Sequence, residues 1–369
     1  MKRITLIGGI ALGLAFSSVQ LLEGGSCGLA PGESEIIYPV EDVSPNVAST
    51  EGIAADFVGN LYVSHRIGGP GAWAVNEIIR ITPWGSTRVI AEFGSAAPGV
   101  FGLLGLTCDW WGNVYVAFAS GNENHGVWKI HRNGRKEHLR GSENIVVPNA
   151  LTFDWRGNLY VSDSYPVSPE APGLIWRYDR RTRSFEVWAS SHDLAPYPFE
   201  NPTSPPPGLF DAPGANGVAF APPNHLYVAN HEKSLILHIP VQCDGTAGEV
   251  TRVTEGGFGG LFFGPDGLSI DMDGNLYAAM ALAGNMPFDM SPILKIYPET
   301  GEVEPLVAPV AGMLPPNFEI PTSLVFGGWF SGRKCLYVAN SGLAAFGLQG
   351  PIGAGVTKVG VGVRGIPLQ

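Results

Sequence analysis

Residues 59–63 read Gly-Asn-Leu-Tyr-Val, and the same five residues return at positions 157–161. Four variants of this motif occur elsewhere in the chain, and each keeps its tyrosine. The motif tyrosines are separated by 53, 45, 67, 50 and 60 residues: Tyr62, Tyr115, Tyr160, Tyr227, Tyr277 and Tyr337. A motif that returns at this spacing indicates an array of equivalent structural units.

Each copy has the same internal order. A short apolar strand comes first, such as residues 150–153, and an Asp-x-x-Gly-Asn turn joins it to the Leu-Tyr-Val strand. Two further strands follow, as in residues 174–178 and 184–188. Four antiparallel strands per unit are typical of a propeller blade, so the sequence predicts an all-β, six-bladed β-propeller. The segment Glu35–Val40 would supply the outer strand of the last blade and close the ring.

The composition agrees with short strands and tight turns. The chain has 369 residues, of which 50 are glycine and 31 are proline, and charged residues make up 15%. These proportions argue against long helices, coiled coils and disorder. The net charge is −11 with the basic residues scattered, which argues against binding to nucleic acid or to an anionic membrane. We expect a monomer that acts on a small molecule.

The amino end has the pattern of a secretory signal peptide. Met1-Lys2-Arg3 is positive, and the apolar run that follows it is too short to span a bilayer. We expect residues 1–26 to be a signal peptide with an undefined cleavage site, and residues 27–369 to be one propeller domain of an exported, periplasmic or extracellular protein. Gly24–Cys27 weakly resembles a lipoprotein box, so a lipid on Cys27 is a minor alternative. No other segment is apolar enough to predict a transmembrane helix.

The cysteines are compatible with an oxidising compartment: Cys27, Cys108, Cys243 and Cys335. They lack the close paired spacing of a zinc site, so structural thiols or a disulfide are the better interpretation. Four cysteines allow three pairings, and the sequence does not choose among them.

The repeat also defines equivalent positions around the axis. The residue eleven positions before each motif tyrosine begins the innermost strand of its blade, with an allowance of four extra residues in the last copy. Innermost strands run side by side around the channel, so these residues would form a ring at one mouth. The ring consists of Glu51, Leu104, Asn149, Asn216, Asp266 and Thr322.

Four members of this ring supply oxygen donors. Two carboxylates and two amides suit a hard cation, since Ca²⁺ takes about six to eight oxygen ligands including neutral carbonyls. Zinc would require His or Cys, which none of the six positions supplies. We therefore expect Ca²⁺, or another divalent cation, to be bound by Glu51, Asn149, Asn216 and Asp266. Taken singly, Asn-Gly and Asp-Gly are also ordinary turn sequences, but their common register favours a metal site.

A second set of equivalent positions lies three residues past each tyrosine, and it consists of His65, Phe118, Asp163, Asn230, Met280 and Asn340. His65 and Asp163 titrate, so we expect them either to act on a substrate or to orient the metal ligands; the alternative is an ordinary structural role. The apolar members Phe118 and Met280 predict a wall that suits a partly hydrophobic ligand.

The sequence resembles the gluconolactonase, senescence-marker-protein and luciferin-regenerating-enzyme family of six-bladed propellers, from about Ser49 to its end. The passages that carry the resemblance are Thr50-Glu51-Gly52, Pro148–Leu151, Ala215–Phe220 and Gly264–Leu268. In that family the corresponding glutamate, two asparagines and aspartate hold a catalytic divalent metal, which implies the same role for the four oxygen donors of the ring. The family's aspartate also transfers a proton or attacks the substrate, which implies a catalytic role for Asp266.

The resemblance implies a metal-dependent hydrolase, but two departures bear on its substrate. Asn149 is followed by Ala150-Leu151 where the family usually has Asp-Gly, and Val147-Pro148 replaces a basic residue that contacts sugar hydroxyls. A more apolar lactone, an ester or a phosphotriester therefore fits better than a sugar lactone. The metal would stabilise charge on the substrate oxygen while Asp266, Asp163 or His65 activates water or attacks.

Two other interpretations stay open. Asn216-Gly217-Val218 and the strand Tyr227–Asn230 also resemble strictosidine-synthase-like propellers, which need no metal. The Asp-x-x-Gly-Asn-Leu-Tyr-Val pattern is shared with non-catalytic binding propellers of the NHL type. The four-oxygen ring favours the hydrolase over both.

Overall fold

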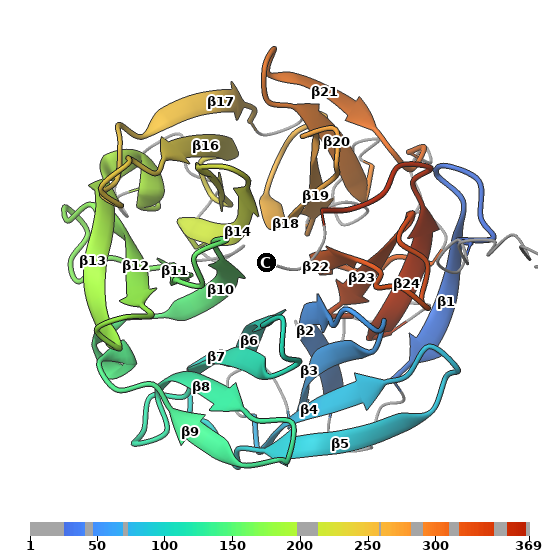
Figure 1. Ribbon diagram of the computed structural model, residues 1–369, viewed down its shortest axis with the longest axis horizontal. Coiled ribbons are helices and arrows are strands. Elements are labelled where there is room, and N and C mark those ends of the chain that lie inside the picture. The colour runs from blue at the N-terminus through green and yellow to red at the C-terminus, as the bar shows by residue number, and fades with distance from the viewer. Residues whose placement is uncertain are drawn as a thin grey trace, which may run out of the picture.

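The computed structural model describes residues 26–40, 47–68, 73–197, 213–257, 260–281, 291–309, 317–342 and 353–366. Six four-stranded antiparallel sheets stand as blades around a central axis (Figure 1). The predicted all-β, six-bladed propeller is therefore confirmed. The described residues include no α-helix and two short 3-10 helices, η1 (Ser142–Asn144) and η2 (His192–Leu194). The expected signal peptide, apart from Ser26, lies outside the described residues.

In the first three blades the strands run outward from the axis in chain order (Figure 1). Blade one consists of β2 (Val47–Ala55), β3 (Leu61–Gly68), β4 (Val75–Ile81) and β5 (Thr87–Glu92). Blade two consists of β6 (Gly102–Cys108), β7 (Val114–Ala119), β8 (Gly126–Ile130) and β9 (Lys136–His138). Blade three consists of β10 (Pro148–Phe153), β11 (Leu159–Asp163), β12 (Gly173–Asp179) and β13 (Ser184–Ser191).

The fourth and fifth blades follow the same order, and the sixth adds a strand from the amino end of the described chain. Blade four consists of β14 (Ala215–Ala221), β15 (His225–Asn230), β16 (Leu235–Pro240) and β17 (Thr251–Glu255). Blade five consists of β18 (Pro265–Ile270), β19 (Leu276–Met280), β20 (Ile293–Tyr297) and β21 (Glu302–Pro305). Blade six consists of β22 (Pro321–Phe326), β23 (Cys335–Asn340), β24 (Gly355–Gly360) and, at its outer edge, β1 (Ser34–Pro39).

A disulfide joins Cys27 to Cys335 of β23, across a sequence separation of 308 residues. Cys108 is a buried free thiol and Cys243 an exposed one. The structure thus selects one pairing among those that the sequence left open. One sulfur cannot carry both a disulfide and a lipid thioether, so the minor alternative of a lipid on Cys27 is wrong for the disulfide-bonded chain. No helix in the described ranges is long and apolar enough to cross a membrane.

The aspartate of the repeated turn explains why the motif has its sequence. In blade one the Asp56 carboxylate accepts hydrogen bonds from the backbone N–H of Gly59 and Asn60, and from the Tyr62 hydroxyl at 3.1 Å. The equivalent tyrosine-to-aspartate bond recurs at Tyr115, Tyr160 and Tyr277. Gly59 has φ 110°, a backbone conformation that glycine adopts freely. In these four blades the turn is therefore tied to the strand that follows it.

The hydrophobic core lies between neighbouring blades. One cluster contains Ala54, Tyr62 and Ile78 of the first blade together with Val116 and Phe118 of the second. The other large clusters likewise join residues of adjacent blades. Burial of apolar surface between blades therefore fixes the innermost strands next to one another around the axis.

Candidate metal and catalytic site

The ring residues lie on the six innermost strands, and each strand is irregular at that point. The pairing with the second strand shifts register between Thr50 and Ile53 in β2, between Ala215 and Val218 in β14 and between Pro265 and Leu268 in β18, and equivalent shifts occur in the other three blades. A β-bulge re-aims a side chain out of the regular alternation of a strand. The predicted ring thus coincides with a set of bulges around one mouth of the channel.

Glycine follows four of the six ring residues because neighbouring strands approach closely there. A Cβ on Gly217 would lie 2.1 Å from the Asp266 carbonyl oxygen, and one on Gly52 would lie 2.3 Å from the Leu104 carbonyl oxygen. Both glycines lie in strands, so the interpretation of Asn216-Gly217 as a turn is wrong. The glycine allows close packing around the axis rather than a reversal of the chain.

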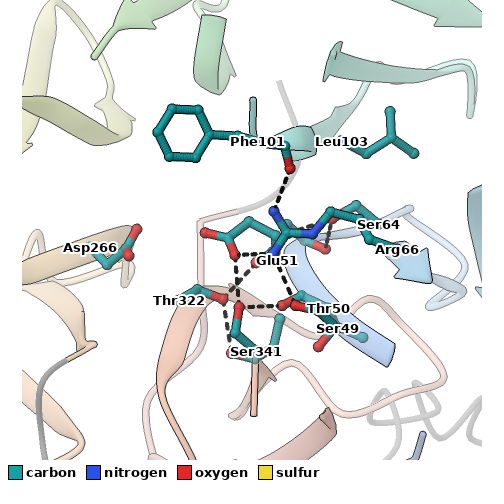
Figure 2. A network of polar contacts seen from close by, with 12 residues as sticks. Ser49, Thr50, Glu51, Ser64, Arg66, Phe101, Leu103, Asp266, Thr322 and Ser341 are labelled. Carbon is teal, nitrogen blue, oxygen red and sulfur yellow. Dashed lines mark hydrogen bonds and ion pairs between the residues drawn. The ribbon is translucent and has the colours of Figure 1, made fainter. Parts of the chain in front are cut away.

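Glu51 is held by two donors (Figure 2). Its Oε2 accepts hydrogen bonds from Arg66 Nη2 at 2.9 Å and from Ser341 Oγ at 2.7 Å. Arg66 also donates to the Phe101 carbonyl oxygen at 2.8 Å and to Ser49 Oγ at 2.9 Å. Burial lowers the pKa of Arg66 and the Glu51 carboxylate opposes that shift. These contacts fix the guanidinium, which in turn keeps Glu51 in place.

Asp266 lies on β18, separated from β2 by the innermost strand of blade six, and Figure 2 draws no hydrogen bond between it and Glu51. Burial raises the pKa of Asp266 well above its ordinary value, and the Glu51 carboxylate raises it further. A hydrogen bond from the Asn216 side chain and the charge of Arg66 act in the opposite direction. The ring thus holds the largely buried Glu51 and the buried Asp266 but one guanidinium, which contacts Glu51, so Asp266 has too little positive charge beside it to ionise at its ordinary pKa.

The two amides are oriented by the chain. Asn149 Nδ2 donates to Ser164 Oγ at 2.9 Å, and the Asn216 amide donates to Asp266. The amide oxygens are the atoms of these two side chains that could coordinate a metal. Among the described residues no cluster of three or more His, Cys, Asp or Glu occurs. With two carboxylates and two amide oxygens, the donor set fits Ca²⁺, which accepts neutral carbonyls, and does not fit zinc.

The predicted second set points away from the ring. His65 Nδ1 lies 2.8 Å from Glu77 Oε1, and the Asp163 carboxylate accepts hydrogen bonds from the backbone N–H of Val146 and Val147 at 3.0 and 2.8 Å. Phe118 and Met280 are fully buried, so they do not form the wall of an open pocket. These residues pair across the sheet with the neighbour of each ring residue, as Thr50 does with His65.

In blades one, three, four and six, the side chains nearest the ring residues lie four residues past the motif tyrosine rather than three. They include Arg66 and Ser341 on Glu51, Ser164 on Asn149, and His231, whose Nδ1 is 4.0 Å from Asp266 Oδ2. Side chains alternate along a strand, so a shift of one residue moves the whole set to the other face. The signal was present in the sequence, because Arg66, Ser164, His231 and Ser341 are polar residues at one common distance from the motif tyrosine.

His231 is a neutral group beside Asp266. It is buried, its Nδ1 has no hydrogen-bond partner among the described residues, and burial lowers its pKa to about 4. A neutral imidazole at this distance leaves the charge of the ring unchanged and offers a nitrogen that can exchange a proton with the Asp266 carboxyl.

Aromatic surface at the ring comes from segments beside the strands. Phe101 precedes β6, is 41% exposed and stacks on Tyr165 with ring centroids 5.8 Å apart. Arg66 lies over the ring of Trp73 at 4.6 Å. Because the Phe101 carbonyl also accepts a hydrogen bond from Arg66, this apolar ledge is fixed to the charged centre. Beyond the ring the channel contains a cavity of about 220 Å³, lined by inner-strand residues such as Ile53 and Leu268.

Solved structures with the same architecture are known. Luciferin-regenerating enzyme is 17% identical and has a TM-score of 0.58, over 89% of this chain and 98% of its own. A gluconolactonase from Xanthomonas campestris is 15% identical with a TM-score of 0.57, over 90% and 89%. The calcium-binding protein regucalcin from Agrobacterium tumefaciens is 13% identical with a TM-score of 0.58, over 92% and 97%. In its fold, the chain resembles this family.

The similarity in structure confirms the resemblance seen in the sequence at the level of the fold. No protein-family model matches the chain, and no curated protein sequence matches it. Identities below about one fifth establish the architecture alone, so the chemistry has to be argued from the ring itself.

Proposed function

We propose that the chain is a calcium-dependent hydrolase of lactones or related esters, with its site at the ring of Glu51, Asn149, Asn216 and Asp266. The observation that carries the proposal is the charge of the ring: it holds two carboxylates, of Glu51 and Asp266, and a single guanidinium, which pairs with Glu51. A divalent cation would supply the missing positive charge, and the two oriented amides would complete an oxygen donor set. When bound, Ca²⁺ would stabilise the negative charge that develops on the carbonyl or phosphoryl oxygen of the substrate.

Asp266 is the residue to which we assign proton transfer. Its carboxylate would take a proton from water as the water oxygen attacks the carbonyl carbon, and would return that proton to the alkoxide when the carbon–oxygen bond of the lactone breaks. The products are one hydroxy acid from a lactone, or an acid and an alcohol from an ester. His231 would share the proton with Asp266, since its free nitrogen faces that carboxylate.

Positioning falls to residues further from the reacting atoms. Arg66 and Ser341 hold Glu51, and Ser164 holds Asn149. Asp163 fixes the backbone just before β10, so we assign it to orienting Asn149 rather than to acting as a base. His65 has Glu77 as its partner and would act on the ring only through its backbone neighbours in β3.

The aromatic ledge of Phe101 and Tyr165 supports a partly apolar substrate, and Val147-Pro148 supplies no cation for sugar hydroxyls. We therefore favour an apolar lactone or ester, with a phosphotriester as a further member of the substrate class. We also propose that the protein is exported as a monomer, because the disulfide Cys27–Cys335 is of the kind that persists in oxidising compartments.

The test is calcium content and thermal melting of wild type and Asp266→Asn, each with and without chelator, followed by hydrolysis of a panel of lactones, esters and phosphotriesters. We expect one calcium ion per chain, a melting temperature that falls by several degrees in chelator, and loss of turnover in Asp266→Asn. Asp244→Asn is the matched control, because Asp244 lies in an exposed turn, where its carboxylate accepts a hydrogen bond from the Thr246 hydroxyl. A wild-type protein that binds no calcium and melts unchanged would overturn the proposal and favour a metal-free synthase-like or binding propeller.

A further inference from the structure

The repeat places a basic residue opposite the motif tyrosine in every blade. The cross-strand pairs are Tyr62 with Arg80, Tyr115 with Lys129, Tyr160 with Arg177, Tyr227 with His238, Tyr277 with Lys295 and Tyr337 with Lys358. Each basic residue in turn faces a residue of the outermost strand. In four blades that residue is a glutamate: Glu137, Glu186, Glu304 and Glu35.

Ion pairs result in three of these blades. Arg177 pairs with Glu186, Lys358 Nζ lies 2.9 Å from Glu35 Oε1, and Lys295 Nζ lies 3.9 Å from Glu304 Oε1. The arrangement of the repeat is therefore a cation on the third strand balanced by a carboxylate on the fourth.

Blade one breaks this arrangement. Arg80 of β4 stands directly opposite Arg88 of β5. Like charges directly opposite each other destabilise a sheet. Neither arginine has an ion pair in the part of the chain that the structure describes, and Arg80 Nε is buried with no hydrogen-bond partner. The position that carries glutamate in four other blades thus carries a second cation, which has no ion pair among the described residues.

Both arginines line a cavity of about 390 Å³ between the first and second blades, and Arg132 of the second blade lines it as well. Its size is within the range of about 300–1,000 Å³ typical of small-molecule sites. The cavity lies at the repeated Asp-x-x-Gly-Asn turns, which join the first and second strands at the ends away from the ring. It is therefore separate from the proposed hydrolytic site.

The other titratable groups of this cavity already have partners. The Asp56 carboxylate accepts four hydrogen bonds, from Gly59, from the backbone and side chain of Asn60 and from Tyr62. His131 is bound to Glu137 at 2.8 Å. These four donors to Asp56 are uncharged, so one carboxylate faces three arginines in the described lining of the cavity, and an excess of positive charge remains there in a protein whose net charge is −11.

Aromatic side chains complete the cavity wall. Phe57, Trp110 and Trp111 line it, and each is about half exposed. Phe57 and Trp110 contact each other with ring centroids 5.1 Å apart. These exposed aromatic rings offer a flat surface on which a ligand ring can stack, and the arginines beside them offer positive charge for an anionic group.

We propose that this cavity is a binding site for a small anion that carries a phosphate, sulfate or carboxylate group on a ring. The arginines Arg80, Arg88 and Arg132 bind the oxyanion, since a guanidinium presents its N–H donors in a fork that matches such groups. The ring of the ligand stacks on Trp110 and Trp111 beside Phe57. An anion between Arg80 and Arg88 removes the repulsion that four other blades avoid with a glutamate.

The experiment uses the variant Arg88→Glu, which gives blade one the residue that four other blades have. Arg140→Glu is the matched control, because it makes the same charge change at an exposed arginine outside the cavity. Binding of phenyl phosphate, glucose 6-phosphate and inorganic phosphate is measured by calorimetry and by tryptophan fluorescence, with phenol and glucose as uncharged controls. Thermal melting without any probe is measured in parallel.

We expect wild type and Arg140→Glu to bind at least one ring-bearing phosphate, and Arg88→Glu to bind it at least tenfold more weakly while melting at the same or a higher temperature. Phenyl phosphate and glucose 6-phosphate show which kind of ring the site takes. Equal binding by Arg88→Glu and wild type, or no binding of any probe to wild type, would overturn the proposal. Binding of inorganic phosphate as tight as that of both ring-bearing probes would overturn the part assigned to the aromatic side chains. Should Arg88→Glu fail to fold, Arg132→Gln tests whether loss of an arginine from the cavity weakens binding of the ring-bearing phosphate.

Discussion

Arg66 Nη2 and Glu51 Oε2 lie 2.9 Å apart, with both side chains largely buried at the mouth of the channel. Through this pair the chain carries its own cation at the ring, and that cation contacts the glutamate rather than the aspartate. Arg66 thus neutralises Glu51 and leaves Asp266 as the carboxylate whose ionisation depends on what else the ring holds.

Replacement of Arg66 by methionine should destabilise the protein strongly. Glu51 would keep its burial and lose its guanidinium, and breaking a buried ion pair on one side costs about 3–5 kcal/mol. Urea unfolding in chelator measures the loss, and we expect saturating calcium to restore part of it. Arg135→Met, which removes a surface pair with Glu137, should cost less than about 1 kcal/mol. Equal effects for the two variants would contradict a special position for Arg66.

The pH dependence of stability should report Asp266. Because its pKa is raised above the ordinary 3.8, the folded chain keeps a proton that the unfolded chain loses, so stability in chelator falls as pH rises from 3.8 through the raised pKa. Each unit of the shift corresponds to about 1.4 kcal/mol. Asp266→Asn lacks this loss, so it should match wild type at low pH and be more stable than wild type above the window.

His231 contributes in the opposite direction. Its pKa is lowered from 6.5 to about 4, so its contribution to stability is present above pH 6.5 and is lost as pH falls to about 4. Since wild type and Asp266→Asn share this histidine, the difference between their unfolding free energies isolates the aspartate. A difference that stays constant from about pH 4 to pH 8 would show that Asp266 ionises normally in the folded chain.

The close approach of the innermost strands can be tested at Gly217. Its replacement by alanine would place a methyl group against the Asp266 carbonyl, and overpacking of this kind costs about 1–3 kcal/mol. Gly257→Ala is the control, because a Cβ there meets nothing within 4 Å. Denaturant unfolding of both variants, with calcium affinity as a second measurement, should show a loss of unfolding free energy for Gly217→Ala and none for Gly257→Ala.

The disulfide should contribute measurably to stability. Removal of a native disulfide typically costs about 2–5 kcal/mol, so Cys27→Ser and Cys335→Ser should each lower the melting temperature. The double variant should lose no more than either single one, since all three lack the same bond. Cys243→Ser, at an exposed free thiol, should leave the melting temperature unchanged. If wild type melts at the same temperature with and without reductant, the bond adds nothing to the folded state.

The architecture could be predicted because a short sequence pattern around the motif tyrosine recurs six times along the chain. Four of the six units join two apolar strands by an Asp-x-x-Gly-Asn turn, and Asp56 shows how few residues fix that turn. The ring positions followed from the same count, because equivalent residues of equivalent strands must lie at one distance from the axis. Spacing along the chain was therefore enough to select Glu51, Asn149, Asn216 and Asp266.

The surroundings of the ring could not be predicted in this way. A bulge in each innermost strand turns the ring residue out of the normal alternation, so the count that placed His65 and Asp163 beside it was off by one residue and reached the opposite face. The side chains that lie beside the ring carboxylates are instead those of Arg66 and His231.

The sequence alone thus determined the number of blades, their strands and the common register of the four residues that we propose as oxygen donors, since these depend on spacing along the chain. The tertiary structure decided which side chains meet those donors, why glycine follows them, and that Cys27 pairs with Cys335. It also brought Arg80, Arg88 and Arg132 to one cavity from two blades. Such contacts depend on distances between strands that are far apart in sequence, and only the packing of the blades around a common axis sets those distances.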